Sequence, residues 1–258
     1  MNQQSPAVKV WSIVYPFLFY YAVMLVTMVL AQWVFGSGKE HYVLCQLIST
    51  LVTLPFMLPF YRQDQALRGI ANTKPQFSGK KAAQILLVVG MVLCFSIALN
   101  NIISMTPLVE ISEGYREANA GFYGSTLALE LISSAVFTPI LEELVFRGII
   151  FGRLRGMMPK LPAVVLSSLI FAAIHFNIVQ FIYALLLGMV LALLMDKVNK
   201  VYPAVIGHMT ANLIAVLRTE TGILENTVQK DAFSWGISIA LLAVGTVLLW
   251  RYLAKEES

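Results

Sequence analysis

The sequence predicts an all-α fold, a polytopic bundle of about eight transmembrane helices with both termini in the cytoplasm. Hydrophobic residues make up 58% of the 258 residues and charged residues only 12%, at a mean hydropathy of +0.76. Soluble domains carry about 25% charged residues, so this chain has too little polar surface to stay in water. Its apolar residues fall in long runs, and its basic residues gather between alternate runs.

Five apolar runs have the length of membrane helices, which need about 20 residues, with a range of roughly 17–25. They are residues 11–35, 41–60, 82–103, 122–150 and 233–250. The first run is longer than the apolar part of a signal peptide, roughly 7–15 residues, so we interpret it as a membrane span. Because such runs fill the chain, we expect one integral membrane domain over residues 1–258.

The apolar stretch 163–217 is interrupted twice, by polar residues at 196–200 and by HFN at 175–177. We therefore divide it into segments 163–176, 178–195 and 202–217. The first would reach about 21 Å at 1.5 Å per residue, short of a hydrocarbon core of roughly 30 Å. The turn at HFN is therefore expected to lie inside the protein, where a buried turn can line a cavity.

The distribution of basic residues predicts the orientation, because cytoplasmic loops are rich in Lys and Arg. With the N-terminus inside, the cytoplasmic side holds thirteen of the eighteen: Lys9, Arg62, Arg68, Lys74, Lys80, Lys81, Arg153, Arg155, Lys160, Lys197, Lys200, Arg251 and Lys255. The outer side holds Lys39, Arg116, Arg218 and Lys230. Both termini are therefore expected in the cytoplasm. The modest net charge of +4 gives no indication of nucleic-acid binding.

The remaining basic residue, Arg147, lies inside the fourth run with Glu142 and Glu143, in PILEELVFRG at 139–148. Ionised side chains in lipid are costly and usually face the protein interior or a water-filled cavity. Glu143 and Arg147 are four residues apart, so they can pair on one helix face. Glu142 points elsewhere and has no local partner. It is a candidate general base. The alternative for Glu142, Glu143 and Arg147 is a purely structural role, as a polar contact that holds helices together.

Two histidines and an asparagine are the other polar residues at depth. His175 and Glu142 each lie 13 residues from the turn predicted near Arg155–Pro162, which places them at a similar depth. His208 and Asn212, in GHMTAN, are four residues apart and share a face. One Glu, two His and one Asn can bind a water and an oxyanion, or can bind a metal. For Asn212 the alternative is a hydrogen bond between helices.

Signatures of other intramembrane chemistries are missing from the sequence. It contains no HExxH zinc motif, no GxSxG nucleophile motif and no GxGD, and its aspartates, Asp64, Asp196 and Asp231, lie in loops. Cys45 and Cys94 fall in apolar runs and are expected to be packed thiols. A transporter is disfavoured because no repeated half with paired broken helices is visible.

Three motifs on successive segments resemble those of the CAAX-protease and bacteriocin-processing family, CPBP, also called Abi. They are EELVFR (Glu142, Glu143, Arg147), FAAIH (Phe171, His175) and HMTAN (His208, Asn212). The resemblance covers roughly residues 122–217, and the motifs stand in the family's order without departure at the key positions.

The resemblance implies an intramembrane endopeptidase that hydrolyses a peptide bond in a peptide or a membrane-protein tail near the cytoplasmic face. It implies that Glu142 and His175 activate the attacking water. His208 and Asn212 would stabilise the oxyanion, and the Glu143–Arg147 pair would shape the site.

The resemblance leaves the cofactor and the substrate open. Catalysis without a cofactor is favoured, although Glu, His and His also make a plausible zinc set. Family members trim prenylated CAAX proteins or are linked to bacteriocin maturation, immunity and cell-envelope regulation. The competing hypothesis is a non-catalytic immunity protein that binds a bacteriocin. The expected partners are the lipid bilayer and a peptide or membrane-protein substrate, in a bacterial cell membrane, with the oligomeric state open.

Overall fold

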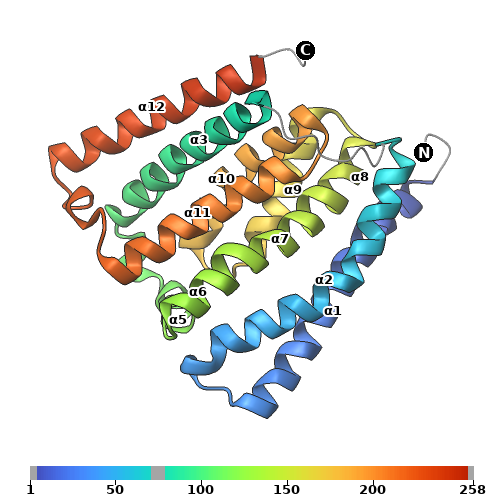
Figure 1. The fold of residues 1–258 in the computed structure, drawn as a ribbon, viewed down its shortest axis with the longest axis horizontal. Helices are drawn as coiled ribbons and strands as arrows, with labels where there is room; N and C mark the ends of the chain where they lie inside the picture. The colour runs from blue at the N-terminus through green and yellow to red at the C-terminus, as the bar shows by residue number, and fades with distance from the viewer. Residues whose placement is uncertain (1–4, 71–78, 255–258) are drawn as a thin grey trace.

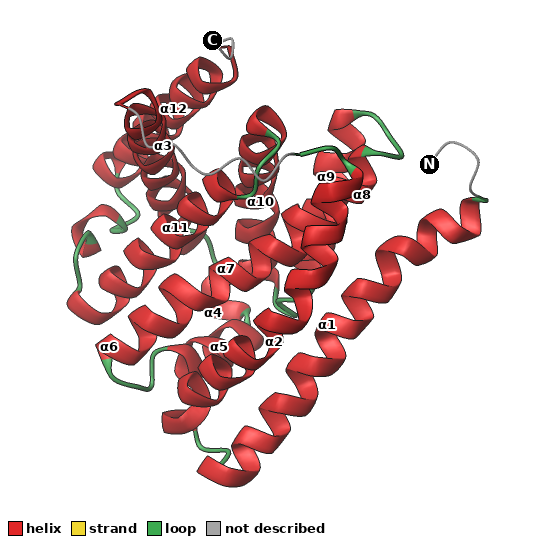
Figure 2. Cartoon of the chain, turned by 45° about the vertical axis from the view of Figure 1, so that its right-hand side comes forward, coloured by secondary structure: helices red, strands yellow, loops and turns green. Residues whose placement is uncertain are grey.

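The computed structural model describes residues 5–70 and 79–254, whose regular structure is helical, with no strand among them (Figure 2). In chain order the elements are α1 (Pro6–Phe35), α2 (Lys39–Leu67), α3 (Gly79–Ser104), α4 (Leu108–Ile111), α5 (Glu113–Phe122), α6 (Leu127–Glu130), η1 (Leu131–Phe137), α7 (Thr138–Glu143), η2 (Leu144–Phe151), α8 (Gly152–Arg155), α9 (Lys160–Ala173), α10 (Ile178–Val198), α11 (Tyr202–Thr221), η3 (Glu225–Thr227) and α12 (Ala232–Ala254). Figure 1 shows the long helices packed side by side in one bundle.

The predicted helical membrane bundle is confirmed. Each of the eight predicted segments coincides with a helical run, and α1, α2, α3, α10 and α12 are long and apolar enough to cross a membrane. The other three runs, which are residues 127–155, α9 and α11, carry the polar residues of the predicted site or adjoin them. The number of crossings and the orientation stay predictions. Two of the basic residues that support the orientation, Lys74 and Lys255, lie outside the described residues.

Successive long helices run antiparallel, so α1 begins and α12 ends at the same end of the bundle (Figure 1). We call this the basic end. There Arg153 pairs with Asp64 at 2.7 Å, which joins α8 to α2, and Arg155 pairs with Asp196 at 2.6 Å, which joins α8 to α10. We call the opposite end, which holds α4, α5 and the start of α6, the α5 end (Figure 1).

The helices α4 and α5 were missed from the sequence, and the fourth run begins at Leu127 rather than at residue 122. A new helix starts there because the Thr126 hydroxyl caps it, accepting a hydrogen bond from the backbone N–H of Leu129 at 3.4 Å. The sequence of α5, EGYREANAGF, is short and polar, so it gives no signal of a membrane span. Its Phe122 ring packs against Tyr42 of α2 at a centroid distance of 5.3 Å.

The fourth run forms the centre of the bundle, since every residue from Glu143 to Gly152 is buried. A helix that is buried all round must pack against neighbours on every side. Two π-helical stretches, η1 and η2, flank α7; in η2 the backbone N–H of Gly152 reaches the carbonyl of Arg147, five residues back. Such wide turns are rare and frequently occur at functional sites.

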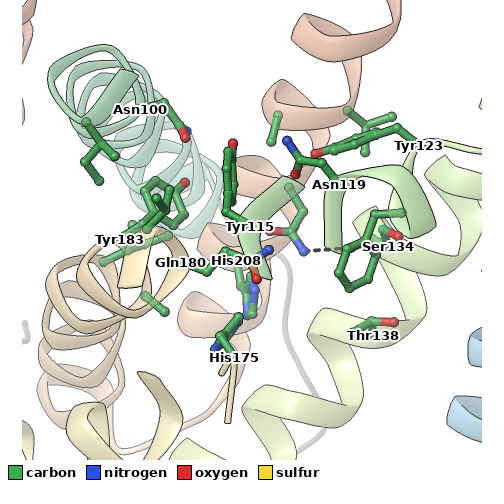
Figure 3. A pocket seen from close by; sticks show the side chains of 18 of the residues that line it. Asn100, Tyr115, Asn119, Tyr123, Ser134, Thr138, His175, Gln180, Tyr183 and His208 are labelled. Atoms are coloured by element: carbon green, nitrogen blue, oxygen red, sulfur yellow. Dashed lines mark hydrogen bonds between the residues drawn. The ribbon is translucent and has the colours of Figure 1, made fainter. Parts of the chain in front are cut away.

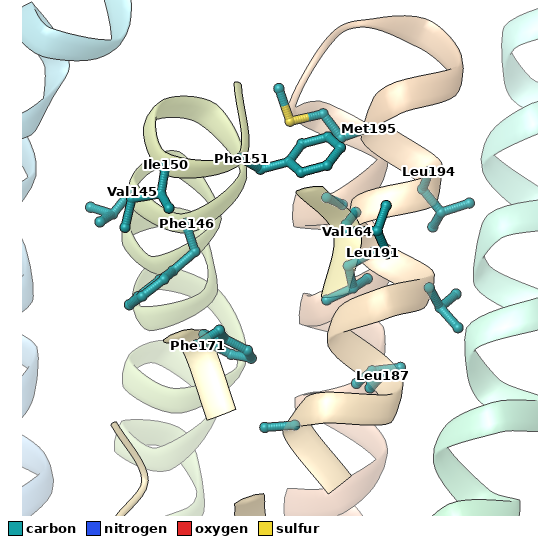
Figure 4. Packing of buried hydrophobic residues seen from close by; sticks show 14 of the residues in the cluster. Val145, Phe146, Ile150, Phe151, Val164, Phe171, Leu187, Leu191, Leu194 and Met195 are labelled. Carbon is teal, nitrogen blue, oxygen red and sulfur yellow. The ribbon is translucent and has the colours of Figure 1, made fainter. Parts of the chain in front are cut away.

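Buried aromatic and aliphatic side chains hold this central run against α9 and α10. Figure 4 shows Phe151 of η2 directed toward Met195, and Phe146 above Phe171. The rings of Phe146 and Phe171 meet edge to face at a centroid distance of 5.1 Å. Edge-to-face pairs add about 0.5–1.5 kcal/mol to the burial of their area. This packing fixes the helix with the two glutamates relative to the helix that leads to His175.

The segment α9 has 14 residues, as predicted, but the turn after it is only partly buried. His175 is half-buried, whereas Phe176 has a φ of 54° and is 81% exposed. Gly114 of α5 covers one side of the turn, where an added Cβ would lie 3.4 Å from Cβ of Asn177. The prediction of a fully buried turn is therefore wrong for Phe176, because α5 covers only part of it.

Candidate active site

A cavity of about 170 Å³ lies between α3, α5, the central run, α10 and α11. Four predicted site residues line it: Glu142, His175, His208 and Asn212. Figure 3 shows His175 and His208 close together beneath Tyr115 and Gln180. Segments far apart in the sequence therefore bring the predicted catalytic residues to one place.

The predicted Glu143–Arg147 pair is present and fully buried. Nη1 of Arg147 donates a hydrogen bond to Oε1 of Glu143 at 2.9 Å, and both side chains are 0% exposed. Nη2 of Arg147 donates to the carbonyl of Gly188 in α10 at 3.2 Å. The guanidinium also lies over the ring of Phe171, 4.3 Å from its centroid. The pair lies behind the cavity wall and joins three parts of the bundle.

His208 contacts both glutamates, a connection that spacing within one helix cannot predict. Its Nδ1 donates to Oε1 of Glu143 at 2.9 Å, since an ionised carboxylate only accepts. Its Nε2 lies 3.7 Å from Oε2 of Glu142. A carboxylate on one ring nitrogen fixes the tautomer and the orientation of the imidazole. Arg147, Glu143, His208 and Glu142 therefore form a connected chain that ends in the cavity.

His175, from the turn after α9, also lines the cavity, close to His208 (Figure 3). Its Nδ1 donates to the carbonyl of Phe171 at 3.2 Å, because a carbonyl can only accept. In the neutral ring this leaves Nε2 with a free lone pair. Neither a hydrogen bond nor an ion pair joins His175 to Glu142 among the described residues; the nearest imidazole nitrogen to Glu142 is on His208. Glu142 and His175 therefore line one cavity without contacting each other.

Asn212 lies on the same face of α11 as His208, as predicted, and also reaches the central run. Its Nδ2 donates to the carbonyl of Ser134 at 2.7 Å. An amide nitrogen carries two N–H groups, so a second donor remains for a bound group. Asn212 thus serves as the interhelical contact that was the alternative interpretation, and it still lines the cavity.

Sequence reasoning gave no role to Phe171 in FAAIH, although its ring separates the site residues. Its centroid lies 5.2 Å from the imidazole of His175 and 5.7 Å from that of His208, in both cases edge to face. With Arg147 over its face, it sets the spacing between the two imidazoles. Neutral polar side chains that also line the cavity were missed: Gln46, Asn100, Tyr115, Asn119, Tyr123, Ser134, Thr138, Gln180 and Tyr183. The sequence feature that could have identified them is a polar residue inside an apolar run, as at Gln46.

The zinc alternative does not fit this arrangement of side chains. Within residues 5–70 and 79–254, no group of three or more His, Cys, Asp or Glu side chains is placed to hold a metal ion. Zinc needs three or four ligands that converge at about 2 Å. We therefore derive no step through a metal.

The carboxyl of Glu130 and the two cysteine thiols lie away from the cavity. Glu130 is buried, and its Oε1 accepts a hydrogen bond from the backbone N–H of Ser125 at 3.1 Å. Cys45 is buried and Cys94 partly buried, and both are free thiols as expected. Neither group lines the cavity.

The cavity lies in the half of the bundle toward the α5 end. Its residues come from the last turn of α3, from α5 and from the first half of α10. The chain termini lie at the basic end (Figure 1). The cavity therefore extends from the middle of the bundle, where Glu142 and His208 lie, toward the end opposite the termini.

Gly188 provides space for the Arg147 guanidinium, so Gly188→Ala is expected to destabilise the protein. An added Cβ would lie 2.8 Å from Nη2 of Arg147 and 3.4 Å from the Ser168 side chain. The guanidinium cannot move aside without loosening its bond to Glu143, and overpacking a buried site costs about 1–3 kcal/mol. Thermal unfolding of the purified protein in detergent checks this. The matched control is Gly90→Ala in α3, where nothing lies within 4 Å of the added atom; equal losses in both variants would contradict the close contact.

Comparison with known proteins gives two matches, both over the part of the chain that holds the site. Residues 124–214 match the family model of the type II CAAX prenyl endopeptidases, Rce1-like. YdiL, a candidate membrane peptidase of Bacillus subtilis, is 30% identical over 89 residues, which is 34% of this chain and 36% of YdiL. The chain thus spans about a third of that curated relative. No solved structure matches significantly. All six predicted site residues fall within the matched segment.

Proposed function

We propose that this chain, whose residues 124–214 match the type II CAAX prenyl endopeptidases, is an intramembrane endopeptidase that uses a glutamate-activated water. One observation carries the proposal. Glu142, His175, His208 and Asn212 line a single cavity inside a helical membrane bundle. Packing alone does not require an acid, two imidazoles and an amide around one polar space.

In the proposed reaction Glu142 is the general base. Its carboxylate accepts a proton from a water, and the water oxygen attacks the carbonyl carbon of the scissile peptide bond. The resulting tetrahedral intermediate carries an oxyanion. When this intermediate collapses, the C–N bond breaks and the leaving nitrogen takes the proton from Glu142. The products are one chain with a new carboxyl terminus and one with a new amino terminus. General bases contribute about 10²–10⁴-fold to such reactions.

The other three cavity residues are proposed to bind the water and the oxyanion. Nε2 of His175 accepts a hydrogen bond from the water, because its Nδ1–H is held by the Phe171 carbonyl. His208 is proposed to donate to the oxyanion through Nε2–H, while its Nδ1–H is held by Glu143. The second N–H of Asn212 donates to the same oxyanion. Removing one oxyanion donor typically costs about 10²–10³-fold in rate.

Glu143 and Arg147 are proposed to act as positioning residues. Glu143 holds Nδ1 of His208 at 2.9 Å, and Arg147 holds Glu143 at the same distance. The amide, hydroxyl and phenol side chains that line the rest of the cavity favour a peptide or a membrane-protein tail as the substrate. The lipid bilayer is the other expected partner, and the reaction is proposed to need no metal.

The test compares cells that express the wild-type protein with cells that express Glu142→Gln at matched membrane abundance. All peptide termini are compared by mass spectrometry. Termini that appear only with the wild-type protein support the protease. The matched control is Glu130→Gln, a buried glutamate of the same central run that does not line the cavity; it should give the wild-type termini. Identical termini in all three strains would favour the binding or immunity hypothesis.

Chelation of metal ions distinguishes the metal-free mechanism from the zinc-dependent one. Because zinc ligands do not converge here, treatment of membranes with EDTA or 1,10-phenanthroline is expected to leave the Glu142-dependent cleavage within about twofold of the untreated rate. The measurement is the amount of the new terminus formed per unit time. Activity that is lost on chelation and restored by zinc alone would contradict the metal-free mechanism.

A further inference from the structure

The two ends of the bundle differ in charge, and the cavity lies at the end with few basic residues. Of the thirteen predicted cytoplasmic Lys and Arg residues, the eleven that the structure describes lie at or near helix termini at the basic end. The four others, Lys39, Arg116, Arg218 and Lys230, lie at the α5 end. Since basic residues mark the cytoplasmic side, the α5 end faces outward.

Most helices that line the cavity do so with the part nearer the α5 end, whereas His208 of α11 lies near the middle of the bundle. The central run contributes Ser134 and Thr138 from its first half and Glu142 from its middle, although it continues to Arg155. From α2, which ends at Leu67, only Gln46 lines the cavity. The amphipathic helix α5 lies across this end and contributes side chains to the wall. The route between the cavity and water is therefore shortest at the α5 end.

The wall near this end is polar but carries no charged group. It contains the amides Asn100, Asn119 and Gln180 and the phenols of Tyr115 and Tyr123 (Figure 3). Burial raises the pKa of the Tyr123 phenol to about 12, so it stays protonated at physiological pH. Amides and phenols both donate and accept, which suits the N–H and C=O groups of a peptide main chain.

Two buried atoms in the wall point to a ligand that can hydrogen-bond. Oε1 of Gln46 and Oγ of Ser134 are buried without a hydrogen-bond partner in the described part of the chain. Both residues line the cavity. Leaving a buried polar atom unpaired costs about 1–3 kcal/mol, so a polar group bound in the cavity would offset that cost.

We propose that the cavity receives its substrate from the outer side of the membrane. The substrate class is a polypeptide segment exposed on the extracytoplasmic face and bound through its main chain by the neutral wall. This rests on the proposed protease function and deepens it. It replaces the expectation of a cytoplasmic tail, which the positions of the cavity and the basic loops do not support.

The orientation is tested by labelling single cysteines in the full chain. Cys45 and Cys94 are first replaced by alanine; one cysteine is then placed at Glu117 in α5 or at Gly156 between α8 and α9, both of which are exposed. In right-side-out spheroplasts, a membrane-impermeant maleimide should label Glu117→Cys and reach Gly156→Cys only after lysis. The reverse pattern would overturn the proposal, whatever the enzyme does.

The side of cleavage is tested by the positions of the Glu142-dependent termini. They should fall in extracytoplasmic segments of membrane or exported proteins. Glu142-dependent termini in cytoplasmic segments would overturn this inference but leave the protease function standing. Absence of such termini, with Glu117→Cys labelled from outside, would instead reject the protease function and keep the orientation.

Discussion

Replacing Arg147 with alanine is expected to destabilise the folded protein by about 3–5 kcal/mol, the usual cost of removing one partner from a buried ion pair. The loss is large because Glu143 would remain fully buried, with only His208 to neutralise it. Arg147 also contributes bonds to Gly188 and a stacking contact with Phe171. The measurement is the fraction of detergent-extracted protein that stays folded on heating. Glu142→Ala leaves no buried cation without a partner, so it should lose much less stability.

A double substitution separates the charge from the shape of the pair. Glu143→Gln combined with Arg147→Met removes both charges and keeps similar volumes, and such replacements of buried ion pairs are often neutral or stabilising. We expect this variant to recover most of the folded protein that Arg147→Ala loses. It should still cleave poorly, because His208 loses its carboxylate partner. If the double variant does not recover stability, the loss in Arg147→Ala comes from the lost contacts of the pair and not from the uncompensated charge of Glu143.

Glu142→Gln is expected to lower the rate of cleavage by about 10²–10⁴-fold while the protein stays folded. Glutamine keeps the shape of the side chain but cannot accept a proton from water. Folding should be spared because Glu142 contacts His208 only at 3.7 Å and faces the cavity. The measurement is the rate at which the Glu142-dependent terminus forms, normalised to folded protein. A loss of less than tenfold would rule out Glu142 as the general base.

The membrane fold could be predicted from the sequence because length and apolarity decide what spans a bilayer. All eight segments were located, but α10 continues to Val198, so the break before α11 covers residues 199–201 rather than 196–200. The helices α4 and α5 were missed because they lie across the end of the bundle rather than through it. A short polar helix such as α5 has no hydropathy signal.

The candidate site was predictable only where partners lie on one helix. The Glu143–Arg147 pair follows from a spacing of four residues and is observed at 2.9 Å. The contact of His208 with Glu143 joins α7 to α11, and no local rule predicts which face of one helix meets another. Equal distances from the predicted turn place His175 and Glu142 at a similar depth. They give no information about the end of the bundle toward which the cavity extends.

The most direct measurement uses purified protein in lipid vesicles and a synthetic peptide that spans a Glu142-dependent cleavage position. Product is quantified by mass spectrometry for the wild-type protein, Glu142→Gln and Glu130→Gln. We predict cleavage at the same bond by the wild-type protein and Glu130→Gln, and a rate at least about 100-fold lower for Glu142→Gln. Equal cleavage by all three, or none by the folded wild-type protein, would contradict hydrolysis by a Glu142-activated water.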